Sequence, residues 1–332
     1  MLINSAEAVY LPRGGKSRPM KKPTNYPTTM KQLKTATDIV SLCVIGLLTG
    51  QASALSLTLI DGSVGAVAAG NTLTAAVQAP ASGINVDGSS IIYQGTAIQG
   101  QTQAATYTGF SLAPSSGSTP TLNLGDGIFL TSGSANIPFT NTTNSFSNAL
   151  LQPGSGSNLL LTTLSGFNTN DANALSFDFT VDPGVTSVSA NFIFGTDEFP
   201  TQSVTDIFGF FVDGVNYAKF SSGELISNTP GNPTNFISNP VGGGLYSIEY
   251  NGLTKAFNVV GILDSGLTTH TLTIGVADTS DSIYDSGVFI GGLKAGTATG
   301  GGGIGTTPDG GTTLVLLGGA LAGIAGLRRR LA

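Results

Sequence analysis

Two short segments of this 332-residue chain concentrate acidic side chains that could bind a cation. They contribute Asp197, Glu198 and Asp206 from the first segment, and Asp278, Asp281 and Asp285 from the second. The second spacing, D-x-x-D-x-x-x-D, does not suit a strand, because alternate strand residues face opposite sides. In a loop, three carboxylates can surround one ion, and Ca²⁺ takes about six to eight hard oxygen ligands.

Basic residues that could neutralise these acids are scarce. Between residues 55 and 305 the chain has sixteen Asp and Glu but only Lys219, Lys255 and Lys294. Clustered carboxylates repel one another unless a cation lies between them. We therefore expect the two acidic loops to meet and bind Ca²⁺; the alternative is that they are separate and solvated, since Asp favours turns. So acidic a body repels phosphate backbones, which excludes nucleic acid as a partner.

Residues for catalysis are few, and we expect no enzyme. His270, the only histidine, falls in an alternating segment and is interpreted as structural. Neither a G-x-S-x-G elbow nor a phosphate loop before a helix is present. Cys43, the only cysteine, lies in an N-terminal apolar segment, which leaves the remaining chain without thiol chemistry.

Three readings of function stay open. The first is a structural or adhesive surface protein whose β domain is stabilised by Ca²⁺. The second is a lectin-like module that binds exopolysaccharide, with tyrosines as platforms because tryptophan is absent; these are Tyr217, Tyr246, Tyr250 and Tyr284. The third is a glycoside hydrolase that uses a carboxylate pair such as Glu198 and Asp281.

The elements that must position these residues are expected to be strands. Period-two alternation occurs in residues 55–59, 175–181 and 270–276, and no apolar 3.6-residue period is long enough for a substantial helix. Residues 182–184, Asp-Pro-Gly, are expected to turn a hairpin into residues 185–194. The chain is 10% charged and has 47 glycines. This predicts an all-β fold over residues 55–295, a jelly-roll-like antiparallel β-sandwich with long loops.

The N-terminus has the three parts of a secretory signal. Lys31 and Lys34 precede the apolar residues 39–48, and Ala52-Ser53-Ala54 is a small-x-small cleavage site. We predict a signal peptide over residues 30–54, helical before cleavage. Residues 1–29 are interpreted as disorder or as an over-extended gene start, with Met30 the better initiator.

The C-terminus is also organised in parts. A Gly-rich linker is predicted over residues 296–306, followed by a tail over residues 307–332. The tail contains Pro308, Asp309, Gly310 and Gly311, a short apolar helix over residues 314–327, and Arg328, Arg329 and Arg330. The apolar part is short for a membrane span, and the arginines would stay on the cytoplasmic side.

This tail resembles the PEP-CTERM class of sorting signals, in its VPDSG-type variant with Thr307 in place of Val. The resemblance implies an exosortase-type sorting enzyme as partner and an inner-membrane stage through the apolar helix. It further implies export to the cell surface, outer envelope or extracellular matrix. The alternative is an ordinary C-terminal membrane anchor.

Six segments between residues 170 and 290 resemble the choice-of-anchor L domain. In order they are NDA, LSFDFTV, FIFGTDEFP, TDIFGFFVDG, EYNGLT and VADTSDSIYDSGVFI, with YTGFS and GIFLTSGSA upstream. The family's usual Ser-Glu-Glu-Tyr is here Thr196-Asp197-Glu198-Phe199, which keeps both carboxylates and loses the tyrosine hydroxyl. The segment after Tyr217 is shorter than the family pattern. The resemblance implies a shared β body joined to varying surface anchors, and so a location more than a mechanism.

Overall fold

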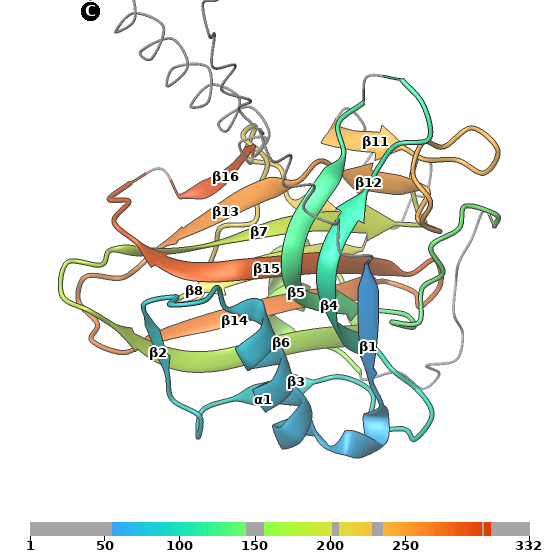
Figure 1. The fold of residues 1–332 in the computed structure, drawn as a ribbon. Helices are drawn as coiled ribbons and strands as arrows, with labels where there is room; N and C mark the ends of the chain where they lie inside the picture. The colour runs from blue at the N-terminus through green and yellow to red at the C-terminus, as the bar shows by residue number, and fades with distance from the viewer. Residues whose placement is uncertain are drawn as a thin grey trace, which may run out of the picture. The chain divides into compact units, whose positions relative to one another are not determined.

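The computed structural model describes residues 55–117, 119–143, 156–200, 206–227, 235–300 and 302–306 (Figure 1). The expected extension, signal peptide and sorting tail lie outside the described residues, as do the two helices expected to flank the β domain. Within the described residues, no helix is both long enough and apolar enough to cross a membrane.

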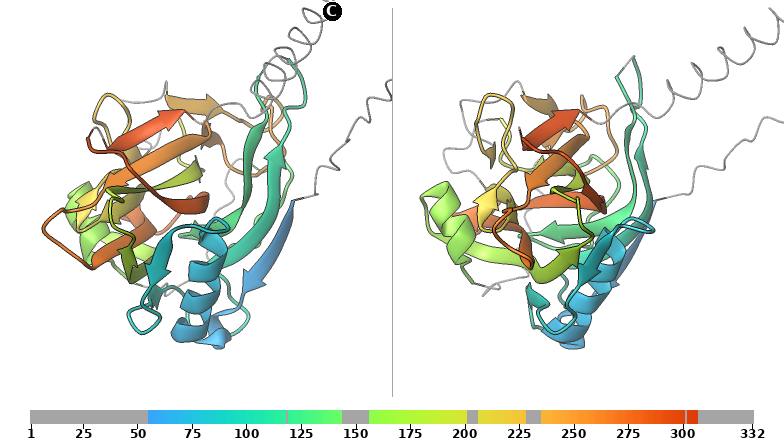
Figure 2. Two further views of the ribbon diagram at one scale, coloured as in Figure 1. Left: turned by 60° about the vertical axis from the view of Figure 1, so that its left-hand side comes forward. Right: turned by 90° about the vertical axis from the view of Figure 1, so that its left-hand side faces the viewer.

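Two antiparallel sheets form a sandwich, which confirms the predicted architecture at that level (Figures 1 and 2). The nine-stranded sheet contains β1 (Ser56–Ile60), β4 (Ala104–Leu112), β5 (Leu122–Thr131), β15 (Ser286–Gly296), β7 (Ser187–Thr196), β12 (Gly252–Thr254) and β11 (Phe236–Ser238) in that order. In the same sheet, β13 (Phe257–Ile262) also pairs with β7, and β16 (Gly303–Thr306) pairs with β13. The seven-stranded sheet contains β10 (Ile226–Ser227), β8 (Ile207–Val212), β14 (His270–Thr279), β6 (Thr169–Val181) and β2 (Ile84–Val86) in that order, with β9 (Val215–Asn216) on β8 and β3 (Ile92–Gln94) on β6.

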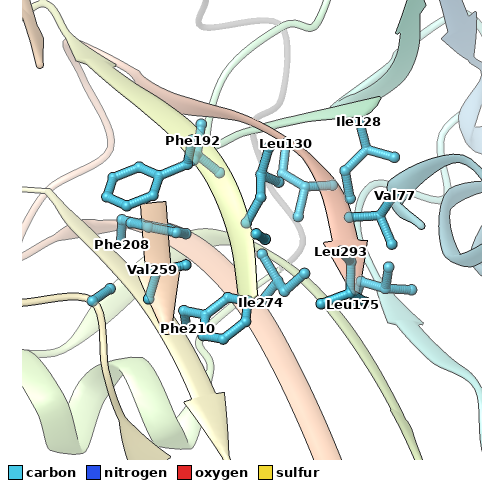
Figure 3. Packing of buried hydrophobic residues seen from close by; sticks show 14 of the residues in the cluster. Val77, Ile128, Leu130, Leu175, Phe192, Phe208, Phe210, Val259, Ile274 and Leu293 are labelled. Carbon is cyan, nitrogen blue, oxygen red and sulfur yellow. The ribbon is translucent and has the colours of Figure 1, made fainter. Parts of the chain in front are cut away.

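The main core fills the space between the sheets. Figure 3 shows side chains from both sheets, such as Phe192 and Phe210, meeting there, with Val77 entering from a helix. A second core lies on the other face of the nine-stranded sheet, where Ile137 and Tyr246 pack beside Phe289. That sheet is therefore buried on both faces along its centre.

The expected hairpin at residues 182–184 is wrong. These residues join β6 of one sheet to β7 of the other, and the two strands do not pair. Each strand carries an apolar row that faces the opposite sheet: Phe177 and Phe179 on β6, Phe192 and Phe194 on β7. Rows of this kind interdigitate and form the core when the two strands belong to facing sheets.

The expectation that the body lacks a substantial helix is also wrong, because α1 (Ala66–Val77) has 12 residues. Its buried positions are Ala69, Gly70, Leu73, Thr74 and Val77. Most of these residues are small or polar, and the exposed face carries no charge, so the apolar period is weak in the sequence. A shorter helix, α2 (Leu159–Ser165), begins after Asn158, whose side chain accepts two backbone N–H bonds, and ends at left-handed Gly166.

The predicted linker over residues 296–306 is partly strand. β16 pairs antiparallel with β13, from Phe257↔Thr306 to Val260↔Gly303. Ile304 packs against the main core. The backbone of β13 thereby gains a partner on its second edge, and the folded domain extends at least to residue 306.

Candidate functional site

At one end of the sandwich, the side-chain rows that face the main core change from apolar to polar. In β5 the row containing Ile128 and Leu130 continues to Ser132, and in β14 the row containing Val276 continues to Asp278. The matching ends of the other central strands carry Asp171 and Asn173 (β6), Thr196 (β7), Asp206 (before β8) and Ser286 (β15). The hydrophobic core therefore ends in a buried polar layer that six strands supply.

The two acidic segments meet in this layer. Five of the six acids expected there are buried, namely Asp197, Glu198, Asp206, Asp278 and Asp285. The backbone N–H of Asp197 donates to the carbonyl of Asp285 at 3.2 Å, and the N–H of Asp206 donates to Glu198 Oε2 at 2.7 Å. Asp281 lies at the rim, half-buried, with its Oδ1 accepting the N–H of Ile283 at 3.3 Å.

Burial and like charge make ionisation of this cluster unfavourable. Burial raises the pKa of Glu198 to about 8; the N–H of Asp206 opposes this shift, while the charges of Asp278, Asp281 and Asp197 add to it. Burial, then the charge of Glu198, holds the pKa of Asp206 well above its usual range. Burial, then the charges of Asp206 and Asp285, does the same for Asp278. A bound cation would reverse this effect and favour the ionised carboxylates.

Asp206 and Asp278 are the most deeply buried members of the cluster. Both side chains are 0% exposed, and none of their carboxylate oxygens makes a well-formed hydrogen bond within the described residues. The Ser286 hydroxyl and the Asp278 carboxyl lie near Asp206, and the Ser132 hydroxyl lies near Asp278. These neighbours act to lower the pKa values of the two acids, against the effect of burial. Buried acids placed in this way require either a proton or a cation.

In the described residues, no three or more acidic, histidine or cysteine side chains are arranged as a ready metal-binding group. Cation binding would therefore require carboxylates of the cluster to draw together. The donor set consists of oxygen atoms only, which matches the preference of Ca²⁺ and does not match that of zinc or copper.

Asp171 belongs to the cluster and was not among the predicted site residues. Its side chain is 4% exposed, and its charge raises the pKa of Asp278. Its φ of 49° is left-handed, at a point where the β14–β6 register shifts between Val276 and Asp278. Like Asp206, Asp171 lies just before a largely buried and mostly apolar stretch. An acidic residue in that position is the signal by which the sequence alone could have marked Asp171 as a candidate.

Tyr250 lies beside the cluster, although the sequence predicts for it only the role of a sugar platform. It is fully buried, and burial raises the pKa of its hydroxyl, with Asp197, Asp285 and Asp206 adding to the shift. A Cβ on Gly195 would lie 2.3 Å from the Tyr250 ring, and one on Gly133 would lie 1.8 Å from Asp285 Oδ2. Glycine at these two positions leaves room for the acidic and aromatic side chains.

The predicted histidine lies apart from the cluster. His270, at the opposite end of β14, is buried, and its Nδ1 lies 2.8 Å from Asp213 Oδ2. Tyr246 is buried like Tyr250, so neither ring can stack on a sugar, whereas Tyr217 and Tyr284 are half-buried. The cleavage residues Ala52 and Ala54 and the sorting residues of the tail lie outside the described residues.

Comparison with known protein families finds two matches in the chain. Residues 77–294 match the choice-of-anchor L domain, and residues 308–331 match the VPDSG-CTERM motif. No curated protein and no solved structure matches the chain. The motif implies processing by an exosortase-type enzyme and marks an exported protein sorted to the cell surface. The chain therefore belongs to the choice-of-anchor L family and carries a VPDSG-CTERM sorting motif.

Proposed function

We propose that this exported protein is a non-catalytic structural or adhesive component of the cell surface or extracellular matrix, with a β domain stabilised by Ca²⁺. The observation that carries the proposal is the convergence of six buried carboxylates, those of Asp171, Asp197, Glu198, Asp206, Asp278 and Asp285, at one end of the core. The sorting motif supplies the location, and Ca²⁺ is a hard cation that is abundant outside cells.

The cluster fits a structural ion better than a catalytic one. Asp206 and Asp278 are fully buried, so no substrate reaches them without opening of the sandwich. Ca²⁺ bound by Asp206, Asp278 and Asp285 would tie β8 and β14 of the seven-stranded sheet to β15 of the nine-stranded sheet, and so join the two sheets at this end. Binding to the native state alone stabilises it in proportion to the logarithm of ligand concentration.

The strand order supports a jelly-roll description of the sandwich. Four strands of the first sheet are β5, β15, β7 and β13, and four of the second are β6, β14, β8 and β10. The chain changes sheet at each step from β5 to β8 and again at each step from β13 to β15. This alternation is the connectivity of two interlocked Greek keys.

Lectin-like binding of exopolysaccharide and carboxylate-based glycoside hydrolysis stay alternatives. Burial of Tyr246 and Tyr250 removes two of the four candidate platforms for the first. For the second, the predicted catalytic pair is Glu198 and Asp281. Glu198 is only 2% exposed, so a substrate that reaches Asp281 at the rim would not also reach Glu198.

Protease resistance on intact cells tests the proposed function. Cells displaying the protein are treated with protease in Ca²⁺ or after washing with EDTA, and loss of surface protein is followed over time. We expect wild type to be resistant only with Ca²⁺, and an Asp206→Asn/Asp278→Asn variant to lose that difference. Asp182→Asn, in an exposed turn, is the matched control and should behave like wild type. Equal resistance of wild type with and without Ca²⁺ would overturn the proposal.

A further inference from the structure

The outer edge of β1 is the longest free strand edge in the described part of the chain. β1 pairs there only with β4, from Ser56↔Thr108 to Ile60↔Ala104. Figures 1 and 2 show it as the last strand on its side of the nine-stranded sheet. The other edge strands, β2, β3, β9, β10, β11 and β16, have two to four residues each, whereas β1 has five.

β1 lacks the features that usually protect a sheet edge. Its sequence, Ser-Leu-Thr-Leu-Ile, contains no charge, proline or glycine, and its register with β4 has no bulge. Leu59 is 41% exposed. Natural proteins place lysine, proline or a bulge on such an edge because its backbone N–H and C=O groups can pair with a further strand. The edge of β1 is therefore suited to strand addition.

The β1 sequence is complementary to itself. In an antiparallel pair of two copies centred on Thr58, the Thr58 residues face each other, and Leu57 of each copy lies opposite Leu59 of the other. This register covers the exposed Leu59, and it extends the second core, against which Leu57 packs, from one copy to the next. Cross-strand Thr–Thr and aliphatic pairs stabilise antiparallel sheets.

Charge also favours a second copy at this edge over other faces of the domain. Residues 55–305 contain sixteen acidic residues and three lysines, so most approaches of two copies are repulsive. β1 brings no charge to the contact. A two-fold axis through one self-complementary patch is the commonest way in which identical chains associate.

We propose that β1 is a homotypic assembly edge, through which two copies of this protein join their nine-stranded sheets by antiparallel pairing centred on Thr58. The proposal does not depend on Ca²⁺. For a surface or matrix protein it supplies a lateral contact between neighbouring molecules.

Disulfide trapping of the full chain tests this register. Cys43, the only native cysteine, is first changed to Ser, and Thr58→Cys is then introduced. We expect a disulfide-linked dimer on a non-reducing gel after mild oxidation, because the two introduced cysteines face each other across the axis. The matched control is Val215→Cys, on the short uncharged edge strand β9, where the side chain is 54% exposed. A monomeric Thr58→Cys chain, or equal dimer at both positions, would overturn the proposal.

A charged variant then tests whether the β1 edge itself forms the contact. Leu59→Lys, added to the Thr58→Cys chain, should abolish most of the dimer because it places a lysine near the axis from each copy. Val215→Lys in the same background should leave the dimer yield unchanged. Thermal unfolding of the Leu59→Lys chain shows whether it folds as wild type does. Undiminished dimer in a folded Leu59→Lys chain would contradict the proposed edge.

Discussion

Asp206 and Asp278 extend the inward rows of two adjacent antiparallel strands, one position beyond the Ile207↔Ala277 pair of β8 and β14. Both side chains are fully buried. After burial itself, the charge of Asp206 raises the pKa of Asp278, whereas Asp278 acts to lower the pKa of Asp206 through a side-chain hydrogen bond. Two carboxylates in this relation cannot both ionise in a dry interior without a compensating positive charge. This relationship is the basis of the proposed cation site.

Asp171 offers a way to separate cation binding from backbone strain. Its left-handed φ is unfavourable for a residue with a side chain and costs nothing for glycine. In EDTA, we expect Asp171→Gly to be at least as stable as wild type, because the change relieves about 1 kcal/mol of strain and removes a buried charge. We expect the same variant to need a higher Ca²⁺ concentration for half-maximal stabilisation.

The control for this prediction is Asp171→Asn, which tolerates the left-handed region and removes only the charge. Ca²⁺ titrations followed by thermal unfolding should show weakened Ca²⁺ binding in both variants. If both variants respond to Ca²⁺ like wild type, Asp171 serves only the local register shift between β6 and β14.

Glu249 links two segments that cover the second core. Although burial acts to raise its pKa, hydrogen bonds from Thr140, Thr142 and Thr143 lower it to about 2. The Glu249 carboxylate accepts backbone N–H bonds from Thr142 and Thr143 at 2.9–3.0 Å as well as their hydroxyls. We expect Glu249→Gln to destabilise the domain by about 2–3 kcal/mol, since charge-assisted bonds are lost.

The pH dependence of this effect has a defined sign. A carboxyl group whose pKa is depressed on folding stabilises the native state above its unfolded pKa, here about 4.5. That contribution is lost as the pH falls from about 4.5 towards 2. The difference in unfolding free energy between wild type and Glu249→Gln should shrink over this range when measured by urea denaturation. A difference that stays constant would contradict the assignment. Glu224→Gln is the control, with an expected change within about 0.5 kcal/mol.

Asp213 holds the far end of the sandwich together. Its carboxylate accepts the N–H groups of Asp264 and Thr271 at 2.9 and 3.0 Å and lies 2.8 Å from His270 Nδ1. Its own φ is 51°, in the left-handed region. We expect Asp213→Ala to cost about 3 kcal/mol in denaturant unfolding, because three bonds are lost and the left-handed residue loses its Asp side chain. Asp213→Asn should cost less, and equal losses in the two variants would contradict this account.

The scarcity of basic residues predicted that the two acidic segments meet at a shared cation, and the structure explains their meeting by their places at the ends of buried strands. Asp206 comes directly before the apolar run of β8, and Asp278 ends the alternating run of β14. Such positions lie at strand ends, and strand ends gather at the ends of a sandwich.

The sequence does not show in the same way which strands share a sheet. The turn after β6 has a hairpin sequence, yet it joins two sheets, and only the packing of Phe177 and Phe179 against Phe192 and Phe194 decides between these outcomes.

Two further features depended on tertiary structure. The helix α1 is formed largely from alanine, glycine and threonine, and its buried face is defined by what it packs against rather than by its own period. Asp171 lies in a segment that reads as the start of a strand. Its left-handed conformation, which arises with the register shift opposite Asp278, has no local signature in the sequence.

The most direct test of the central claim is thermal unfolding of the purified chain during a Ca²⁺ titration that starts in EDTA. Extracellular Ca²⁺ sites bind at about 0.1–1 mM, so the titration should extend to several times that range. We predict a saturable rise in melting temperature for wild type, no rise for Asp206→Asn/Asp278→Asn, and a wild-type response for Asp182→Asn. An unchanged wild-type melting temperature throughout the titration would show that the buried carboxylates are held by protons and not by a cation.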